Sequence, residues 1–266
     1  MLEALQFEFI QNAIMAGILV SVASGIIGSL VVVNRMVFLA GGIAHTSYGG
    51  IGLAVYFSFP IFLGASLFSV LATLLMAFIT LNQRDKIDVF IGLIWAVGMA
   101  IGIILVDLTP GYNVDLMSYL FGSILAVSKE DLVYMSSLVF VTIGIVSIFY
   151  REILAVSYDS QFASLRGINV KFFYTLILVL SSLVIVIAIK VVGLILVIAL
   201  LTIPVYMASS LSNSLGIMMF ISGVFATIFT LLGLYLSYMY DMTSGASIII
   251  VSAIALIIFL IGKRLR

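Results

Sequence analysis

The sequence predicts an all-α protein: a polytopic helical bundle that spans a membrane and forms a single domain over residues 1–266. Two observations support this fold class. Of the 266 residues, 64% are hydrophobic and only 8% are charged, whereas a water-soluble domain carries about 25% charged residues. The charges also fall in short interruptions between long apolar runs, which is typical of a polytopic helical membrane protein.

The apolar runs predict about nine spans, with eight as the alternative count. Each run approaches the ~20 residues that a helix needs to cross ~30 Å of hydrocarbon. The run from Phe172 to Ala208 is too long for one span and leaves almost no loop for two. A tight hairpin near Lys190–Gly193 or one shortened helix is expected there, with a kink at Pro204. The predicted spans are 10–33, 37–57, 60–81, 89–106, 132–150, 172–189, 191–208, 214–237 and 246–262.

A shorter segment, 116–127, would reach only ~18 Å as a helix. If it does not cross, the N-terminus lies outside, the C-terminus lies inside, and only Lys129 and Lys190 of the eleven basic residues face outward. If it does cross, the basic loop 151–171 moves outside, against the positive-inside rule. We therefore interpret 116–127 as a short re-entrant helix on the outer face.

This topology also places acidic residues at the outer ends of the spans. Seven of the eleven acidic residues fall on the outer side in this topology, and three of them, Asp107, Asp115 and Asp241, are the candidates for an entrance. An acidic entrance would concentrate cations. Ordinary solvated loop acids are the alternative interpretation, so the entrance remains one of two hypotheses.

The histidine at position 45 is the only one in the chain, and it lies within a glycine-rich apolar run. Ten helical residues separate it from Arg35 at the cytoplasmic edge, which places it ~15 Å deep. Gly41, Gly49 and Gly52 share its helix face and predict a seam of close helix packing. Two interpretations stay open: a structural histidine, or an imidazole that guides a divalent metal through the membrane.

The sequence lacks the residues and motifs that several kinds of catalytic and metal-binding site require. The chain has no Cys, so it has no thiolate metal site and no Cys nucleophile. It carries no GxxxxGK[ST], GxSxG or HExxH motif, so it is not expected to be an enzyme or to hydrolyse ATP by itself. No permanently bound cofactor is expected.

The cytoplasmic stretch 159–167, with sequence DSQFASLRG, predicts a short amphipathic helix that ends at a glycine. Such a helix could dock another protein. A plain surface loop is the alternative.

The chain resembles the permease subunits of bacterial ABC importers for zinc, manganese and iron. The matching segments are RM at 35–36 followed by GIAH at 42–45, DLMSYLFGSILAVSKEDL at 115–132, KVVGL at 190–194 with LLTIP at 200–204, and TSGASIIIVSA at 243–253. The stretch 159–170, DSQFASLRGINV, is similar to the family's coupling helix.

The resemblance implies a permease subunit in the bacterial cytoplasmic membrane. Its expected partners are a second copy of the chain, a cytoplasmic ATPase and an extracytoplasmic metal-binding protein, with no nucleic acid. It also implies that His45 guides the transported divalent metal ion and that Asp159, Ala163, Leu165 and Gly167 couple to the ATPase. Many relatives carry an aspartate four residues before this histidine; here that position is Gly41. Because carboxylate oxygen suits Mn²⁺, zinc is the expected ion, with manganese or iron as alternatives. A self-sufficient ion-coupled secondary transporter or channel is the alternative function.

Overall fold

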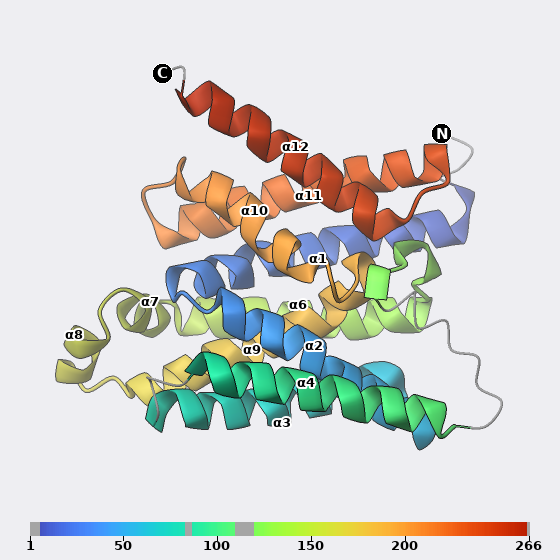
Figure 1. Cartoon of the computed structure of the whole chain (residues 1–266). Coiled ribbons are helices and arrows are strands. Elements are labelled where there is room, and N and C mark those ends of the chain that lie inside the picture. Colours follow the sequence, from blue (N-terminus) through green and yellow to red (C-terminus); the bar gives the residue numbers. More distant parts are fainter. Residues whose placement is uncertain (1–5, 83–86, 110–119, 265–266) are drawn as a thin grey trace. The chain divides into compact units, whose positions relative to one another are not determined.

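The computed structural model describes residues 6–82, 87–109 and 120–264. All the secondary structure within these ranges is helical (Figure 1), which confirms the all-α fold class. The α-helices are α1 (Glu8–Val33), α2 (Val37–Tyr56), α3 (Ile61–Asn82), α4 (Ile87–Asp107), α6 (Lys129–Ile148), α7 (Tyr150–Tyr158), α8 (Ser160–Leu165), α9 (Val170–Val192), α10 (Val197–Ser209), α11 (Leu215–Tyr240) and α12 (Ser244–Arg264), with a 3₁₀ turn, η3, at Ile124–Ala126.

Seven of these helices are long and apolar enough to cross a membrane: α1, α3, α4, α6, α9, α11 and α12. Two helices in predicted spans are not among them. The 20 residues of α2 include five glycines, His45 and several hydroxyl groups, which lower its hydropathy. At 13 residues, α10 is short and reaches only ~20 Å. The polytopic helical class is thus confirmed, with seven candidate spans among the described residues, one helix of weaker apolar character (α2) and one short apolar helix (α10).

The chain divides into two compact units. Unit one consists of Met1–Val32, Leu116–Ile143 and Ile187–Arg266, and unit two of Val33–Asp115 and Gly144–Val186. The boundaries fall inside α6 and α9, so each of these helices contributes residues to both units.

In unit two, α2 packs closely against both α3 and α4. Glycines make the close approach possible, because a side chain at these positions would collide with the neighbouring backbone. A Cβ atom on Gly52 would lie 2.6 Å from the Cα of Gly102, and one on Gly49 would lie 2.8 Å from the carbonyl oxygen of Gly98. The Gly98–Gly102 pair of α4 therefore forms a helix-packing surface against α2.

In unit one, small and hydroxyl side chains join α1 to α11. A Cβ on Gly25 would lie 2.5 Å from backbone atoms of Gly223. The Ser222 hydroxyl donates to the carbonyl oxygen of Gly25 at 2.9 Å, and the Ser21 hydroxyl donates to Thr230 at 3.1 Å. Interhelical hydrogen bonds between small residues are a common way to hold membrane helices together.

The break between α9 and α10 is held by contacts with one other segment of unit one, residues 120–123. Gly193 has a φ of 92°, a conformation that favours glycine. Its neighbour in space, Gly122, has a φ of 76°, and a Cβ on Gly193 would lie 2.5 Å from the Gly122 nitrogen. The amide of Ser123 donates to the carbonyl oxygen of Lys190 at 3.0 Å, and the amide of Ile195 donates to that of Leu120 at 3.3 Å. The non-helical backbone thus finds hydrogen-bond partners within the protein, as a membrane setting requires.

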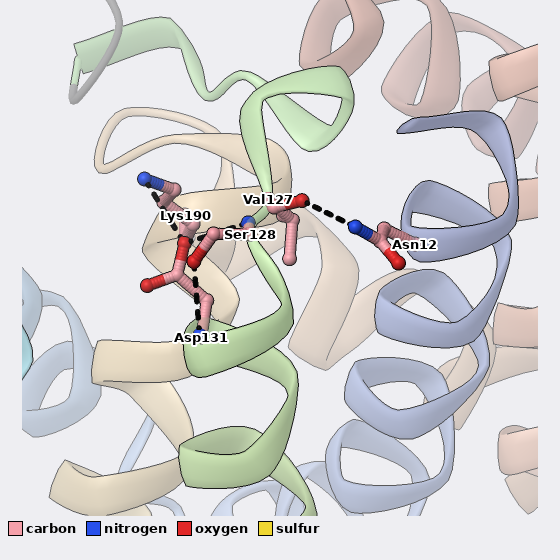
Figure 2. A network of polar contacts seen from close by, with 5 residues as sticks. All are labelled: Asn12, Val127, Ser128, Asp131 and Lys190. Atoms are coloured by element: carbon pink, nitrogen blue, oxygen red, sulfur yellow. Dashed lines mark hydrogen bonds and ion pairs between the residues drawn. The ribbon is translucent and has the colours of Figure 1, made fainter. Parts of the chain in front are cut away.

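A polar network secures the start of α6 next to the end of α9 (Figure 2). The Ser128 amide donates to the Asp131 carboxylate at 3.1 Å, and the Asp131 amide donates to the Ser128 hydroxyl at 3.1 Å, which is a reciprocal helix cap. The Lys190 ammonium lies 3.5 Å from the same carboxylate. Asn12 of α1 donates its side-chain amide to the Val127 carbonyl oxygen at 3.2 Å. These contacts tie three segments of unit one together.

The structure differs in detail from the sequence-based expectations at the α9–α10 break, at Pro204 and in segment 116–127. The break expected near Lys190–Gly193 is present, since α9 ends at Val192 and α10 begins at Val197, six residues later than the predicted span. With 13 residues, α10 corresponds to the shortened helix that was the alternative to a hairpin. Pro204 lies inside α10, and the helix continues through it. Within the predicted re-entrant segment 116–127, residues 116–119 lie outside the described residues, and η3 is the only complete helical turn in the rest.

Candidate functional site

The middle of α2 is closely packed against neighbouring helices, and His45 is the one residue there that is not buried. From Leu39 to Gly52 every residue except His45 is buried. The predicted seam glycines Gly41, Gly49 and Gly52 belong to this buried stretch. Within this stretch, the imidazole is therefore the one side chain that is partly exposed.

Two residues of α4 hold the His45 ring. The indole of Trp95 stacks on the imidazole, with ring centroids 3.9 Å apart and an interplanar angle of 16°. The Sδ atom of Met99 lies 3.3 Å from His45 Nδ1. Trp95 and Met99 are four residues apart, so they lie on the same face of α4.

The same two helices are joined by a hydroxyl group one residue further along. The Thr46 hydroxyl donates to the Gly42 carbonyl oxygen at 2.6 Å and approaches the Ile94 carbonyl oxygen of α4 at 3.4 Å. A Cβ on Gly98 would lie 2.6 Å from the Thr46 methyl group. This tight packing fixes the position of Trp95 and Met99 relative to His45.

Among the described residues, no group of three or more His, Asp or Glu side chains could hold a metal ion. Of the three predicted entrance acids, Asp107 ends α4 in unit two and Asp241 caps α11 in unit one, and both are exposed. Asp115 lies outside the described residues. The groups that the structure brings to His45 are thus a stacked indole and a thioether sulfur rather than carboxylates, and of these only the sulfur can donate to a metal ion.

The predicted cytoplasmic helix is present as α8. The Asp159 carboxylate accepts a hydrogen bond from the Phe162 amide at 2.9 Å, which caps the N-terminus. The C-terminus closes on Gly167, with a φ of 78°, while the Gly167 amide donates to Ser164 and the Ile168 amide donates to Ala163. This paired arrangement is a Schellman motif.

The helix α8 exposes apolar and basic groups together. Leu165 is 88% exposed and Phe162 is 47% exposed, whereas Ala163 is fully buried. The Arg166 guanidinium lies over the Phe162 ring, 4.7 Å from its centroid. An exposed leucine beside an aromatic–arginine pair is the type of surface that protein interfaces use.

Sequence reasoning did not identify Trp95 and Met99 as part of the site. One signal was present: Trp95 is the only tryptophan in the chain, and it precedes Met99 by four residues in the span that carries the Gly98–Gly102 pair. The pairing with His45 depends on which helix packs against α2, and sequence spacing does not contain that information.

The ABC 3 transport family matches residues 6–263. The chain belongs to this family. Across 264 residues it is 45% identical to an uncharacterised membrane protein of Synechocystis, covering 99% of this chain and 94% of that protein. It is 33% identical over 250 residues to the manganese transport system membrane protein MntC of Listeria monocytogenes, covering 94% of this chain and 89% of that protein.

A solved structure, PsaBC from Streptococcus pneumoniae in complex with Fab, has a TM-score of 0.89 and 32% sequence identity. The similarity covers 97% of this chain and 93% of that chain. The resemblance to permease subunits of bacterial ABC metal importers is therefore confirmed. As a member of the ABC 3 transport family, the chain is a multi-pass membrane transport subunit, not an enzyme, and the ATPase is a separate partner.

Proposed function

We propose that this chain forms the membrane-spanning part of an ATP-driven importer for a divalent transition-metal ion, with zinc as the expected cargo. The observation that carries the importer part of this proposal is similarity along nearly the whole chain to MntC, which is named as a manganese transport system membrane protein. The expectation of zinc rests on Gly41, which stands where many relatives carry a carboxylate. Because the similarity covers 94% of the chain, it extends to the whole membrane domain and is not limited to one motif.

Nine spans, with the N-terminus outside and the C-terminus inside, remain our proposed topology for a single permease domain over residues 1–266. Seven long apolar helices support it directly. Helix α10 can serve as a shortened span because the preceding non-helical backbone finds partners inside unit one. Lys263 and Arg264 in the last turn of α12 agree with an inner C-terminus.

We propose that His45 guides the ion. Its exposure within an otherwise buried stretch of α2 supports this role, because a polar residue at membrane depth is costly and usually functional. A single imidazole does not hold a metal, so the site needs further donors. A homodimer with the pathway along its two-fold axis would supply a second His45.

We propose that α8 couples to the ATPase through Asp159, Ala163, Leu165 and Gly167, which have different parts in it. Asp159 and Gly167 close the two ends of the helix, Ala163 is buried on its inner side, and Leu165 is exposed. Both ends of the helix are closed by its own side-chain and backbone hydrogen bonds, so it can transmit force as one rigid piece. Leu165 and Phe162 face outward for contact with the cytoplasmic ATPase. An extracytoplasmic metal-binding protein would deliver the ion on the opposite side, where Asp107, Asp115 and Asp241 form the proposed acidic entrance.

The decisive experiment is ATP-dependent ion uptake into vesicles that hold the chain with its ATPase and binding protein. We expect uptake of Zn²⁺ and weaker uptake of Mn²⁺, since carboxylate oxygen suits Mn²⁺ and position 41 is glycine. His45→Ala should abolish uptake while assembly with the ATPase persists. Thr227→Val is a matched control, because its hydroxyl only returns to the Gly223 carbonyl oxygen within α11.

Absence of ATP-dependent uptake of Zn²⁺, Mn²⁺ and Fe²⁺ would refute the importer. Uptake of Mn²⁺ equal to that of Zn²⁺ would refute the zinc preference alone. Full ion uptake by His45→Ala would show that the histidine serves only in helix packing.

A further inference from the structure

The cluster of His45, Trp95 and Met99 brings a nitrogen donor and a sulfur donor together in unit two. His45 Nδ1 and Met99 Sδ are 3.3 Å apart, and each belongs to a partly exposed residue. The two side chains come from different helices, α2 and α4, whose glycine-mediated packing leaves little freedom between them.

This separation is suited to the binding of one ion by both atoms. Zinc binds imidazole nitrogen at about 2.0–2.1 Å and thiolate sulfur at about 2.3 Å, and the thiolate distance serves here as the guide for the thioether of Met99. At a bond angle of roughly 90–110°, those lengths place the two donors roughly 3.1–3.6 Å apart, and the observed distance falls in that range. An ion could therefore enter between the two atoms with little movement of either helix.

Trp95 restricts how the imidazole can turn. A ring stacked at 3.9 Å and 16° loses contact area if it rotates about its Cβ–Cγ bond, and aromatic pairs favour specific geometries. Trp95 is thus a positioning residue: it holds the His45 ring plane so that Nδ1 points toward Met99.

The chemical type of the donor atoms determines which metal ions a site prefers. Thioether sulfur and imidazole nitrogen favour soft and borderline ions such as Zn²⁺ and Cu⁺, whereas carboxylate oxygen suits Mn²⁺. Gly41, one turn before His45, supplies no carboxylate.

We propose that Met99 is the second protein ligand of the transported ion, and that the His45–Met99 pair selects a soft or borderline transition-metal ion over Mn²⁺. This inference rests on the importer function proposed above. Water or the same pair from a second copy completes the coordination. The competing account is an Nδ1–H···S hydrogen bond that only supports packing.

The test uses the permease–ATPase assembly, labelled with selenomethionine and loaded with Zn²⁺. This chain contains no Cys, so Met residues are its only source of a heavy chalcogen ligand. X-ray absorption at the zinc edge should show a selenium neighbour in the wild type and lose it in Met99→Leu. Met135→Leu is the matched control, because Met135 is fully buried in α6 and lies outside the cluster. Trp95→Leu should keep the selenium signal but weaken Zn²⁺ binding, as expected for a positioning residue.

Uptake measurements complete the test. Met99→Leu should lower Zn²⁺ uptake at limiting concentration roughly 10-fold or more, since changes even one shell further out cost about 10–100-fold in metal affinity. Mn²⁺ uptake should change by less than about 2-fold, because that ion gains little from a thioether. Absence of a selenium neighbour, or its persistence in Met99→Leu, would overturn the Met99 assignment even if uptake is normal. Failure of every variant and the wild type to transport any ion would overturn the importer function instead.

Discussion

Substitution of Gly52 by alanine tests the closest approach between α2 and α4. The added Cβ would lie 2.6 Å from the Cα and 2.9 Å from the carbonyl carbon of Gly102. Ordinary contacts of this kind are at 3.4–4 Å, and the atoms met are backbone, which does not rotate aside. The two helices therefore have to separate by about 1 Å, a gap that forfeits a quarter to a half of each dispersion contact.

The magnitude follows from two opposing effects. Overpacking costs about 1–3 kcal/mol, whereas glycine to alanine within a helix gains up to about 1 kcal/mol in helix propensity. Gly92→Ala is the matched control, because it lies on α4 and its Cβ would meet nothing within 4 Å. Since both variants share the propensity gain, their difference in free energy of unfolding isolates the packing cost, about 1–3 kcal/mol.

Trp95 is the only tryptophan in the chain and lies on α4 at this interface, so its fluorescence reports the unfolding of unit two. Reversible unfolding of the purified chain in mixed micelles, titrated with sodium dodecyl sulfate, gives both free energies. Equal stability of Gly52→Ala and Gly92→Ala would refute the close approach of α2 to α4.

Two further predictions concern the ion pair of unit one and the surface of α8. Lys190→Met should destabilise the fold by about 1–3 kcal/mol, because it leaves a largely buried Asp131 carboxylate without its cation; adding Asp131→Asn should recover part of that loss. Equal unfolding midpoints for Lys190→Met and the wild type would contradict this. Leu165→Ser should leave stability within about 0.5 kcal/mol, as surface substitutions do, yet reduce co-purification with the ATPase. Leu211→Ser, at a position 54% exposed in the loop after α10, should leave co-purification unchanged, and an identical yield for both variants would exclude Leu165 from the contact.

The lengths of the apolar runs located the helices well where each run is bounded by polar residues. The predicted span 37–57 corresponds to α2 at Val37–Tyr56, and 10–33 corresponds to α1 at Glu8–Val33. The prediction was poorest at 191–208, where α10 starts only at Val197. Leu194, Ile195 and Leu196 are as apolar as a helix interior, so their composition does not reveal that they form a connection.

The physical reason for this break lies in contacts distant in sequence. Gly193 adopts a left-handed φ because the backbone of residues 120–122 crosses it. Gly245 approaches the same crossing, where its Cβ would lie 2.9 Å from the carbonyl carbon of Val192. The three segments that meet here, around residues 120–122, Gly193 and Gly245, are brought together by the whole fold. The residues next to Gly193 in the sequence therefore do not predict the break.

The candidate site divides in the same way. Glycine spacing and a lone polar residue in an apolar run identified His45, because burial of an imidazole in hydrocarbon is costly wherever it occurs. The residues that contact its ring, Trp95 and Met99, lie on another helix. Met99 is 54 residues away from His45, and no spacing pattern in the sequence connects residues so far apart.

The sequence by itself determined that this is a membrane protein, where most of its helices lie, and that it has a capped helix at 159–167, since hydropathy and capping act over one or two turns. Only the tertiary structure decided that α10 is shortened and that a thioether, rather than a carboxylate, approaches the histidine. Those outcomes depend on which helices come into contact, and helix contacts in this fold are selected by glycine surfaces that match across long distances in the chain.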